Sequence, residues 1–207
     1  MTSYLSRIAL ISAVFMAGFA HAQFEGPALG AGPWVFENFE ESNLKVSVLA
    51  RGMDHPFGLV FIPGTASAAN PLGDVLLTER TGKVRLFRNG ALRAAEVVDL
   101  TQVFPVQQLF DIELHPRFAE TGLVYFTWIK QQPHPDCSSK LWATTALARG
   151  RWNGEELLQL EELFEASTGY SDNICGASSR LHFLIDGTLL MGVSHRCEEL
   201  APQSLDS

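Results

Sequence analysis

The residues best suited to chemistry lie close together near the C-terminal end of the sequence. Cys175, His195 and Cys197 fall within one stretch of about two dozen residues. Two thiols can close a disulfide, whereas two thiols with an imidazole are typical zinc ligands. Both readings stay open at this point, and the disulfide is the one we expect if the protein is exported, since cysteine pairs in exported proteins are usually structural bridges.

A β-hairpin is the element that would position these residues. Apolar runs at residues 181–185 and 189–193 flank Asp186-Gly187, and Asp-Gly between apolar runs is among the strongest short-range hairpin signals. A turn centred near Asp186 pairs residues at equal distances from it, so Cys175 faces Cys197. Small and polar residues then gather at the open end of the hairpin, as in a binding site on a β scaffold: Gly176, Ser178, Ser179, Ser194 and His195. A disulfide-closed loop with nothing bound is the alternative.

Residues 1–22 have the pattern of a secretory signal peptide. Arg7 precedes an apolar run at residues 8–19 that is too short to span a membrane, and Ala20-His21-Ala22 fits a cleavage site. An uncleaved anchor is the alternative. Cleavage predicts a periplasmic or secreted protein in an oxidising compartment, with Gln23 as the first mature residue.

Three cysteines in such a compartment allow one disulfide and leave one thiol. We expect the bridge between Cys175 and Cys197. Cys137 is then left over, or it pairs with either of the others.

Composition limits the function classes. The chain has 207 residues, of which 46% are hydrophobic and 18% charged, as in a packed globular protein. A net charge of −8 without a Lys/Arg cluster argues against a nucleic-acid partner. No segment predicts membrane association after signal cleavage, and nothing indicates an oligomeric state.

The pattern from residue 45 onward predicts an all-β fold. Short apolar runs recur about every ten residues between turn residues. The expected strands are residues 45–49, 58–62, 74–79, 83–87, 96–100, 110–114, 123–129, 141–149 and 163–166, followed by the hairpin. Residues 154–166 also have a helix-compatible spacing, although we expect strands there. Residues 23–43 have no period and are predicted to be a lead-in segment.

The sequence also repeats about every 50 residues, and each repeat has an apolar strand, a turn and a second apolar strand. Such repeats are typical of propeller blades. Four segments carry a resemblance to a known family: ARGMDHPFGLVFIP, DVLLTERTGKVRLF, LFDIELHPRFAETGLVYFTW and SSRLHFLIDGTLLMGVSHR. In this order they resemble the glucose/sorbosone dehydrogenase family, the soluble aldose dehydrogenases that depend on pyrroloquinoline quinone (PQQ). The resemblance implies a six-bladed β-propeller with PQQ over the central channel and calcium holding it. Residues 44–207 would form a partial propeller domain of about two blades and the first hairpin of a third.

The resemblance also implies a reaction, in which a small-molecule sugar loses hydride from C1 to the quinone and becomes a lactone. A general base must take the proton of the C1 hydroxyl. The family's base is a His four residues before the Arg of a His-x-x-x-Arg-Leu segment. Arg180-Leu181 match the end of this segment, but the base position is Gly176, which cannot accept a proton.

Two further family positions differ. The family's Asp near the base is replaced by Ser194-His195, and His195 becomes the candidate base because imidazole has a suitable pKa range. The family's Gln that contacts PQQ or sugar falls on Val106, or on Gln107 if the match slips by one residue. The cofactor-binding candidates are therefore Gln107 and Arg180, and the resemblance identifies no calcium ligand within this chain.

Other catalytic patterns are absent or incomplete. The segment GASSR lacks the second Gly of a nucleophile elbow, and the sequence has no HExxH, P-loop or GxGxxG motif. His55-Pro56 and His115-Pro116 are interpreted as turn residues beside strands. The sequence thus leaves three hypotheses: a PQQ-dependent sugar dehydrogenase, a related propeller without the chemistry that binds a sugar or a protein, and a purely structural β-domain.

Overall fold

A computed structural model describes residues 30, 32–36, 44–134, 137–166 and 177–194, without the side chains of residues 134–142. Contacts divide the chain into two units, Met1–Ser47 and Val48–Ser207. In the first unit, strand β1 (Trp34–Phe36) pairs antiparallel with β2 (Leu44–Val46). Strand β1 lies inside the predicted lead-in segment, because its Trp-Val-Phe sequence has high β propensity and finds a partner in β2. The predicted signal peptide, residues 1–22, lies outside the described residues.

The second unit begins with a sheet of the order β3-β4-β5-β6, with β7 also pairing with β5. Its strands are β3 (Pro56–Phe61), β4 (Val75–Glu79), β5 (Lys83–Arg88), β6 (Ala91–Leu92) and β7 (Val98–Asp99). A short 3-10 helix, η1 (Leu100–Gln102), leads to the next sheet. That sheet has the order β11-β10-β9-β8.

The strands of the second sheet are β8 (Val106–Leu114), β9 (Leu123–His134), β10 (Cys137–Trp152) and β11 (Leu157–Glu165), with helix α1 (Phe118–Thr121) between β8 and β9. The hairpin of β12 (Ser179–Phe183) and β13 (Leu189–Val193) follows. Nearly all the regular structure in the described residues is therefore antiparallel β, which confirms the predicted fold class. None of the helices in this described part is long and apolar enough to cross a membrane.

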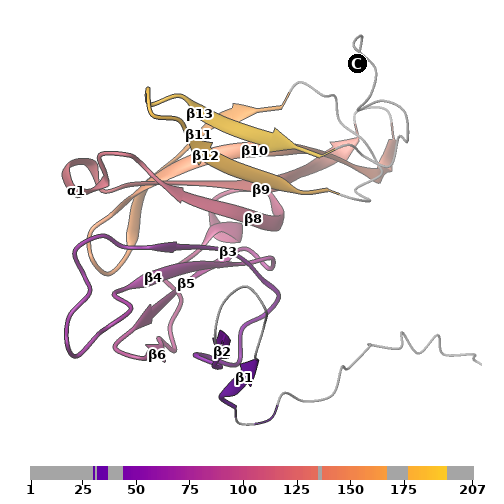
Figure 1. The fold of residues 1–207 in the computed structure, drawn as a ribbon. Coiled ribbons are helices and arrows are strands. Elements are labelled where there is room, and N and C mark those ends of the chain that lie inside the picture. The colour runs from indigo at the N-terminus through magenta and orange to yellow at the C-terminus, as the bar shows by residue number, and fades with distance from the viewer. Residues whose placement is uncertain (1–29, 31, 37–43, 135–136, 167–176, 195–207) are drawn as a thin grey trace, which may run out of the picture. The chain divides into compact units, whose positions relative to one another are not determined.

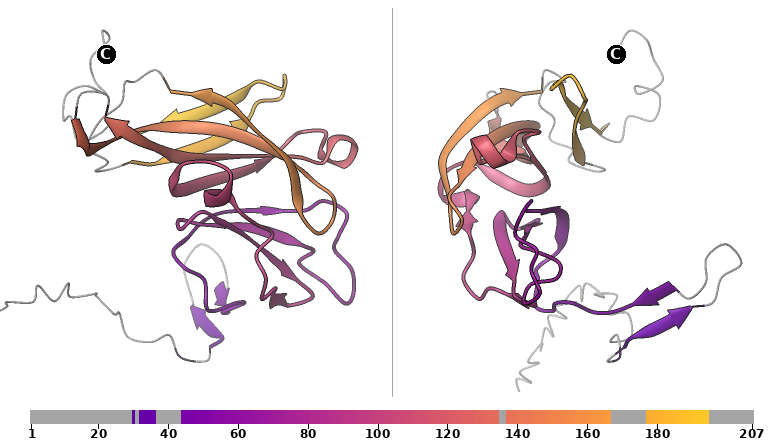
Figure 2. Two further views of the ribbon diagram at one scale, coloured as in Figure 1. Left: turned by 180° about the vertical axis from the view of Figure 1, so that it is seen from behind. Right: turned by 60° about the vertical axis from the view of Figure 1, so that its left-hand side comes forward.

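The sheets of the second unit are arranged as successive propeller blades. Strand β8 packs against β3 and against β12, and Figure 1 shows β8 between these two strands, with the same three sheets seen from other sides in Figure 2. The three strands β3, β8 and β12 are thus the inner strands of consecutive blades. The described residues form two blades and the first hairpin of a third, as predicted.

The predicted hairpin is confirmed, with its register. Ser179 pairs with Val193 and Phe183 with Leu189, which places the turn at Asp186-Gly187. Gly187 has a φ of 87°, a left-handed conformation that glycine adopts without steric cost. The turn residues therefore set which side chains face one another along both strands.

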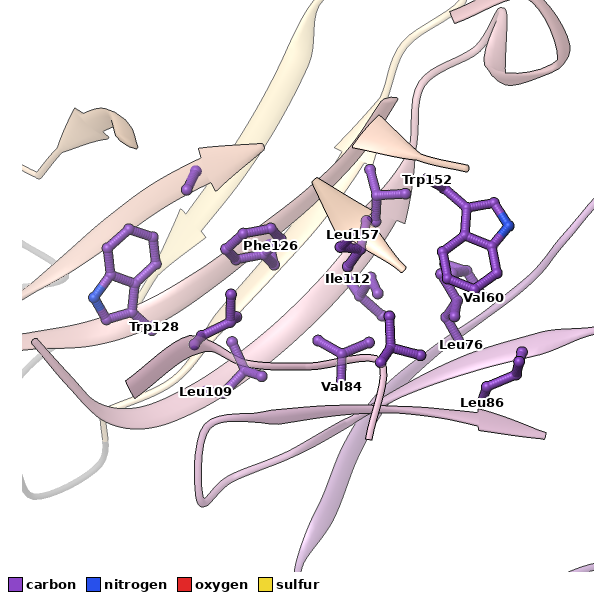
Figure 3. Close-up of a cluster of buried hydrophobic side chains, with 14 of the residues drawn as sticks. Val60, Leu76, Val84, Leu86, Leu109, Ile112, Phe126, Trp128, Trp152 and Leu157 are labelled. Atoms are coloured by element: carbon purple, nitrogen blue, oxygen red, sulfur yellow. The ribbon is translucent and has the colours of Figure 1, made fainter. Parts of the chain in front are cut away.

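The main hydrophobic core fills the space between the first two blades (Figure 3). Val84 and Leu86 contribute from the first blade, and Leu109, Phe126 and Trp128 from the second. All five are fully buried. Two smaller clusters continue toward the third blade, one around Phe110, Ile129 and Ala143 and the other around Tyr125, Leu147 and Leu181. Burial of these apolar faces fixes the blades against one another.

Candidate functional site

The N-terminal ends of the inner strands β3, β8 and β12 meet in one cluster of polar and aromatic side chains. The backbone of Arg80, directly after β4, joins the first two blades, since its N–H donates to His55 O and its carbonyl accepts from Leu109 N, both at 3.0 Å. We name this group the strand-start cluster, and its members are Phe57, Arg80, Gln108, Phe110, Asp111 and Arg180, together with Gln107, which directly precedes Gln108 in β8.

Asp111 links the second blade to the third. Its side chain is buried, with the residue 7% exposed, and Oδ2 accepts a hydrogen bond from Leu181 N at 2.8 Å. Oδ1 accepts from Arg180 Nη1 at 3.1 Å. Asp111 lies in a β-bulge, where the register shifts between Leu109 and Ile112, and bulges redirect side chains in this way. One carboxylate therefore fixes both the backbone of β12 and the Arg180 guanidinium.

Gly58 on β3 leaves the room that this carboxylate occupies. A Cβ atom at position 58 would lie 2.9 Å from Asp111 Oδ1 and 3.1 Å from Ile112 N. Both distances are shorter than normal carbon contacts, so a larger residue would displace the carboxylate or the strand. All three inner strands thus meet at Asp111.

Arg180 is held at two points and still reaches solvent. Its Cζ lies 4.8 Å from the centroid of the Phe57 ring, a cation–π arrangement, and Asp111 binds one side of the guanidinium. The Arg180 side chain nevertheless remains 66% exposed. A fixed and accessible guanidinium is suited to binding an anion such as a carboxylate.

Arg80 makes a second arrangement of the same kind. Its Cζ lies 5.9 Å from the Phe110 ring centroid, and Phe110 contacts Phe57 with ring centroids 5.2 Å apart. Arg80 Nη2 donates to Gln108 Oε1. Two arginines thus stack on a pair of touching aromatic rings.

Gln107 lies in another bulge, nearer the start of β8, where the register shifts between Val106 and Gln108. Its Oε1 is buried and has no hydrogen-bond partner among the described residues. Buried polar atoms normally have partners, so an unpaired one beside a site is available to a ligand or water. Val106 instead packs against the main core, which supports Gln107 as the candidate of the two.

The open end of the hairpin is closed by two serines. Ser178 N donates to Ser194 Oγ at 2.7 Å, and Ser194 N donates to Ser178 O at 3.2 Å. The remaining predicted residues of this end lie outside the described part of the chain: Cys175, Gly176, His195 and Cys197. Their predicted disulfide and catalytic roles stay predictions. Within the described ranges, no three His, Cys, Asp or Glu side chains form a group that could hold a metal ion, so the calcium expectation finds no donor set there.

Both histidines that precede proline lie beside strand ends, as predicted. His55 has a φ of 52° in the turn before β3, and its Nδ1 lies 2.5 Å from Asp54 Oδ1. His115 follows β8 and accepts a hydrogen bond from Arg117 N through Nδ1 at 3.0 Å. The acceptor role of this nitrogen places the ring proton of neutral His115 on Nε2.

Glu113 is the titratable group whose pKa the site most clearly changes. Burial raises the pKa of Glu113 above 4.5, and the nearby Asp111 charge raises it further, while His182 lowers it. The Asp111 charge therefore changes the pKa of a second residue of β8 that is not one of its hydrogen-bond partners.

The sequence named Gln107 and Arg180 as candidates, and their cofactor-binding role stays a prediction, whereas it pointed to none of Phe57, Arg80 and Asp111. A signal existed for two of them, because Arg80 and Asp111 are charged residues within or beside apolar strand runs. Their partners, however, lie in other blades and cannot be found from local spacing.

Comparisons with known proteins agree with this architecture. A family model described as Glucose / Sorbosone dehydrogenase matches residues 53–207. The uncharacterized protein slr1608 of Synechocystis sp. is 34% identical over 164 residues, which is 74% of this chain and 36% of that protein.

Solved structures show the same fold. The PQQ-bound form of an aldose sugar dehydrogenase from Streptomyces coelicolor has a TM-score of 0.59 at 19% identity, covering 86% of this chain and 47% of its own. The apo-form of the soluble aldose sugar dehydrogenase from Escherichia coli has a TM-score of 0.50 at 21% identity, covering 74% and 41%. The chain therefore spans less than half the length of these relatives.

Proposed function

This chain belongs to the Glucose / Sorbosone dehydrogenase family, and we propose that it is an exported propeller protein that binds PQQ at the strand-start cluster. The observation that carries the proposal is the Arg180 guanidinium, fixed by Asp111 and Phe57 and still 66% exposed. Export rests on the predicted signal peptide of residues 1–22.

The chemistry of the cluster fits this cofactor. PQQ is a flat aromatic quinone that carries carboxylate groups, so its site needs cations and apolar surface. Arg80 and Arg180 supply two guanidinium groups, and Phe57 and Phe110 supply aromatic rings beside them. Gln107 adds an amide whose Oε1 lacks a protein partner in the described region. No comparable donor set for calcium lies among these residues.

In this proposal the residues of the chain bind and orient. Arg180 forms an ion pair with a carboxylate of the quinone. Asp111 holds the guanidinium through Oδ1, and the hydrogen bond from Leu181 N to Oδ2 keeps the Asp111 carboxylate itself in place. Gln107 hydrogen-bonds the sugar or the quinone. Bound PQQ would supply the acceptor for the hydride of the sugar C1.

The proton of the C1 hydroxyl has no acceptor at the family position, because that position is Gly176. General-base assistance contributes about 10²–10⁴ in rate, so we propose slow or absent aldose oxidation. His195 is the candidate that would restore it, since it follows Ser194 at the same end of the hairpin. A propeller that binds a sugar or a protein without oxidising it is the second candidate function, and Gly176 is the observation that favours it.

An equilibrium titration with PQQ tests the proposal. The intact protein is titrated in the presence of calcium, beside Arg180→Met and the matched control Arg117→Met. Arg117 lies next to α1 and its side chain is 71% exposed. We expect PQQ to bind the natural protein and the control equally, and Arg180→Met to bind at least tenfold more weakly. No binding by the natural protein would remove this function, and equal binding by all three proteins would show that PQQ does not bind at Arg180.

A further inference from the structure

Arg80 carries a positive charge that no carboxylate of the described chain neutralises. Its hydrogen-bond partner is the neutral amide of Gln108, and its Nε is buried without a partner in the described residues. A guanidinium has five N–H donors, so most of its donor capacity is unused within this part of the chain. Partly buried cations normally have an anionic partner, because removal from water is costly without one.

The acidic groups near Arg80 are already engaged. Glu79, the preceding residue, binds Arg85 at 3.0 Å and also accepts from Asp54 N at 3.0 Å. Asp54 contacts His55. Asp111, at the other end of the cluster, binds Arg180 and Leu181. Among the described residues, therefore, no carboxylate is left to pair with Arg80.

The surroundings of Arg80 hold its guanidinium in one orientation. Phe110 lies beneath it at 5.9 Å, Gln108 fixes Nη2, and the Arg80 backbone is tied to both blades. A guanidinium whose position is set in advance loses little freedom when it binds, and its planar fork matches a carboxylate.

From these observations we propose that Arg80 is a binding residue for a carboxylate group of the ligand, at the junction of the first two blades. The inference deepens the proposed function and rests on it for the location of the site. Two sources supply this chemistry: a carboxylate of the quinone cofactor, or the carboxylate of an acidic sugar such as a uronate. In either case Gln108 aligns the guanidinium and Phe110 supports it.

Four probes separate the two sources in binding titrations on the intact protein: PQQ, its trimethyl ester, glucuronate and glucose. The variants are Arg80→Met, whose thioether can keep contact with Phe110, and Arg80→Lys, which keeps the charge but loses the fork. Arg117→Met is the control. Should Arg80→Met fail to fold, Arg80→Lys is used instead. It is expected to weaken binding of the same acidic probe, by a smaller factor.

We expect Arg80→Met to bind one acidic probe at least tenfold more weakly and its neutral counterpart unchanged. Loss for PQQ but not for the ester assigns the cofactor, and loss for glucuronate but not for glucose assigns the sugar. Unchanged binding of both acidic probes by the variants would overturn the inference while leaving the proposed function standing. A natural protein that binds glucuronate through Arg80 but no PQQ would retain the inference and remove the function. Binding of neither acidic probe by the natural protein would overturn both.

Discussion

Asp111 and Arg180 join two neighbouring blades through a single carboxylate, which accepts from Arg180 Nη1 at 3.1 Å and from Leu181 N at 2.8 Å. The two residues are 69 positions apart in the sequence. Because the carboxylate is buried and the guanidinium is exposed, Asp111 sets the position of a group that a ligand can reach. The geometry of the third blade's first strand is thus coupled to the Arg180 guanidinium of the strand-start cluster.

Gly58→Ala tests this junction by sterics alone. The new Cβ would lie 2.9 Å from Asp111 Oδ1, so we expect unfolding free energy to fall by about 1–3 kcal/mol and the Leu181 amide to exchange faster with solvent. Gly192→Ala is the matched control, since its Cβ would meet Arg180 backbone atoms at an ordinary 3.7 Å. Urea unfolding and hydrogen exchange measure both effects. Equal behaviour of the two variants would contradict the crowding at Asp111.

Arg88 connects the first blade to the β10–β11 turn. It binds Asp74 Oδ2 through Nε and Nη2, at 2.9 and 2.6 Å, and also reaches Gly154 O at 2.7 Å. Asp74 is 5% exposed, so Arg88→Ala would leave a buried carboxylate without its cation.

We expect Arg88→Ala to cost about 2–3 kcal/mol of unfolding free energy, less than the 3–5 typical of fully buried pairs because the Arg88 side chain is 29% exposed. Arg117→Ala, which breaks an exposed pair with Glu120, should cost less than about 1 kcal/mol. Denaturant midpoints of the two variants give the comparison, and similar small losses would show that the Arg88–Asp74 pair contributes little to stability.

Glu113 should make stability depend on pH. Its pKa is raised above 4.5 in the folded protein by burial and by Asp111, so its contribution to stability is fully present below pH 4.5 and is lost as pH rises through the folded pKa. Glu113→Gln removes this loss. We expect the variant to be more stable than the natural protein at pH 7 and equal to it at pH 4.

Denaturant unfolding at the two pH values measures this difference. Glu120→Gln, on a side chain that is 68% exposed, serves as the control and should show no such change with pH. A Glu113→Gln variant that is no more stable at pH 7 than at pH 4, relative to the natural protein, would contradict the predicted direction.

The confirmed hairpin register supports a disulfide between Cys175 and Cys197, since both lie at equal distances from Asp186. A bridge requires Cα atoms within about 7 Å. Peptide mapping of the exported protein without reduction should recover these two cysteines in one linked peptide, with Cys137 as a free thiol. Recovery of Cys137 linked to either of them would show the alternative pairing.

Local signals in the sequence predict much of the fold. The Asp186-Gly187 turn lies between two apolar runs, so both strands and their register follow from a few residues. Strand β11 is harder to predict, because its apolar residues have a helix-like spacing. The structure explains this, since register shifts occur along β11 opposite Leu147/Ala148 and Arg149/Arg151 and interrupt the alternation of a regular strand.

The candidate site is only partly predictable. Arg180 follows from the family resemblance and Gln107 from a one-residue slip of that match, and Gln107 lies in the first bulge of β8. The role of Asp111 depends on the second bulge of that strand and on contacts with Gly58 and Leu181 in other blades. Contacts over such separations depend on blade packing, which local periodicity does not encode.

In the proposed function, this family member binds PQQ but has glycine, Gly176, at the position of the family's general base. The most direct measurement is the rate of quinone reduction after an aldose is added to the PQQ-loaded natural protein, with Gly176→His in parallel. We predict reduction about 10²–10⁴ slower than with a general base in place, and faster reduction in the histidine variant. Reduction by the natural protein at ordinary enzyme rates, about 1–10³ s⁻¹, would contradict the account and place the base at His195 or elsewhere.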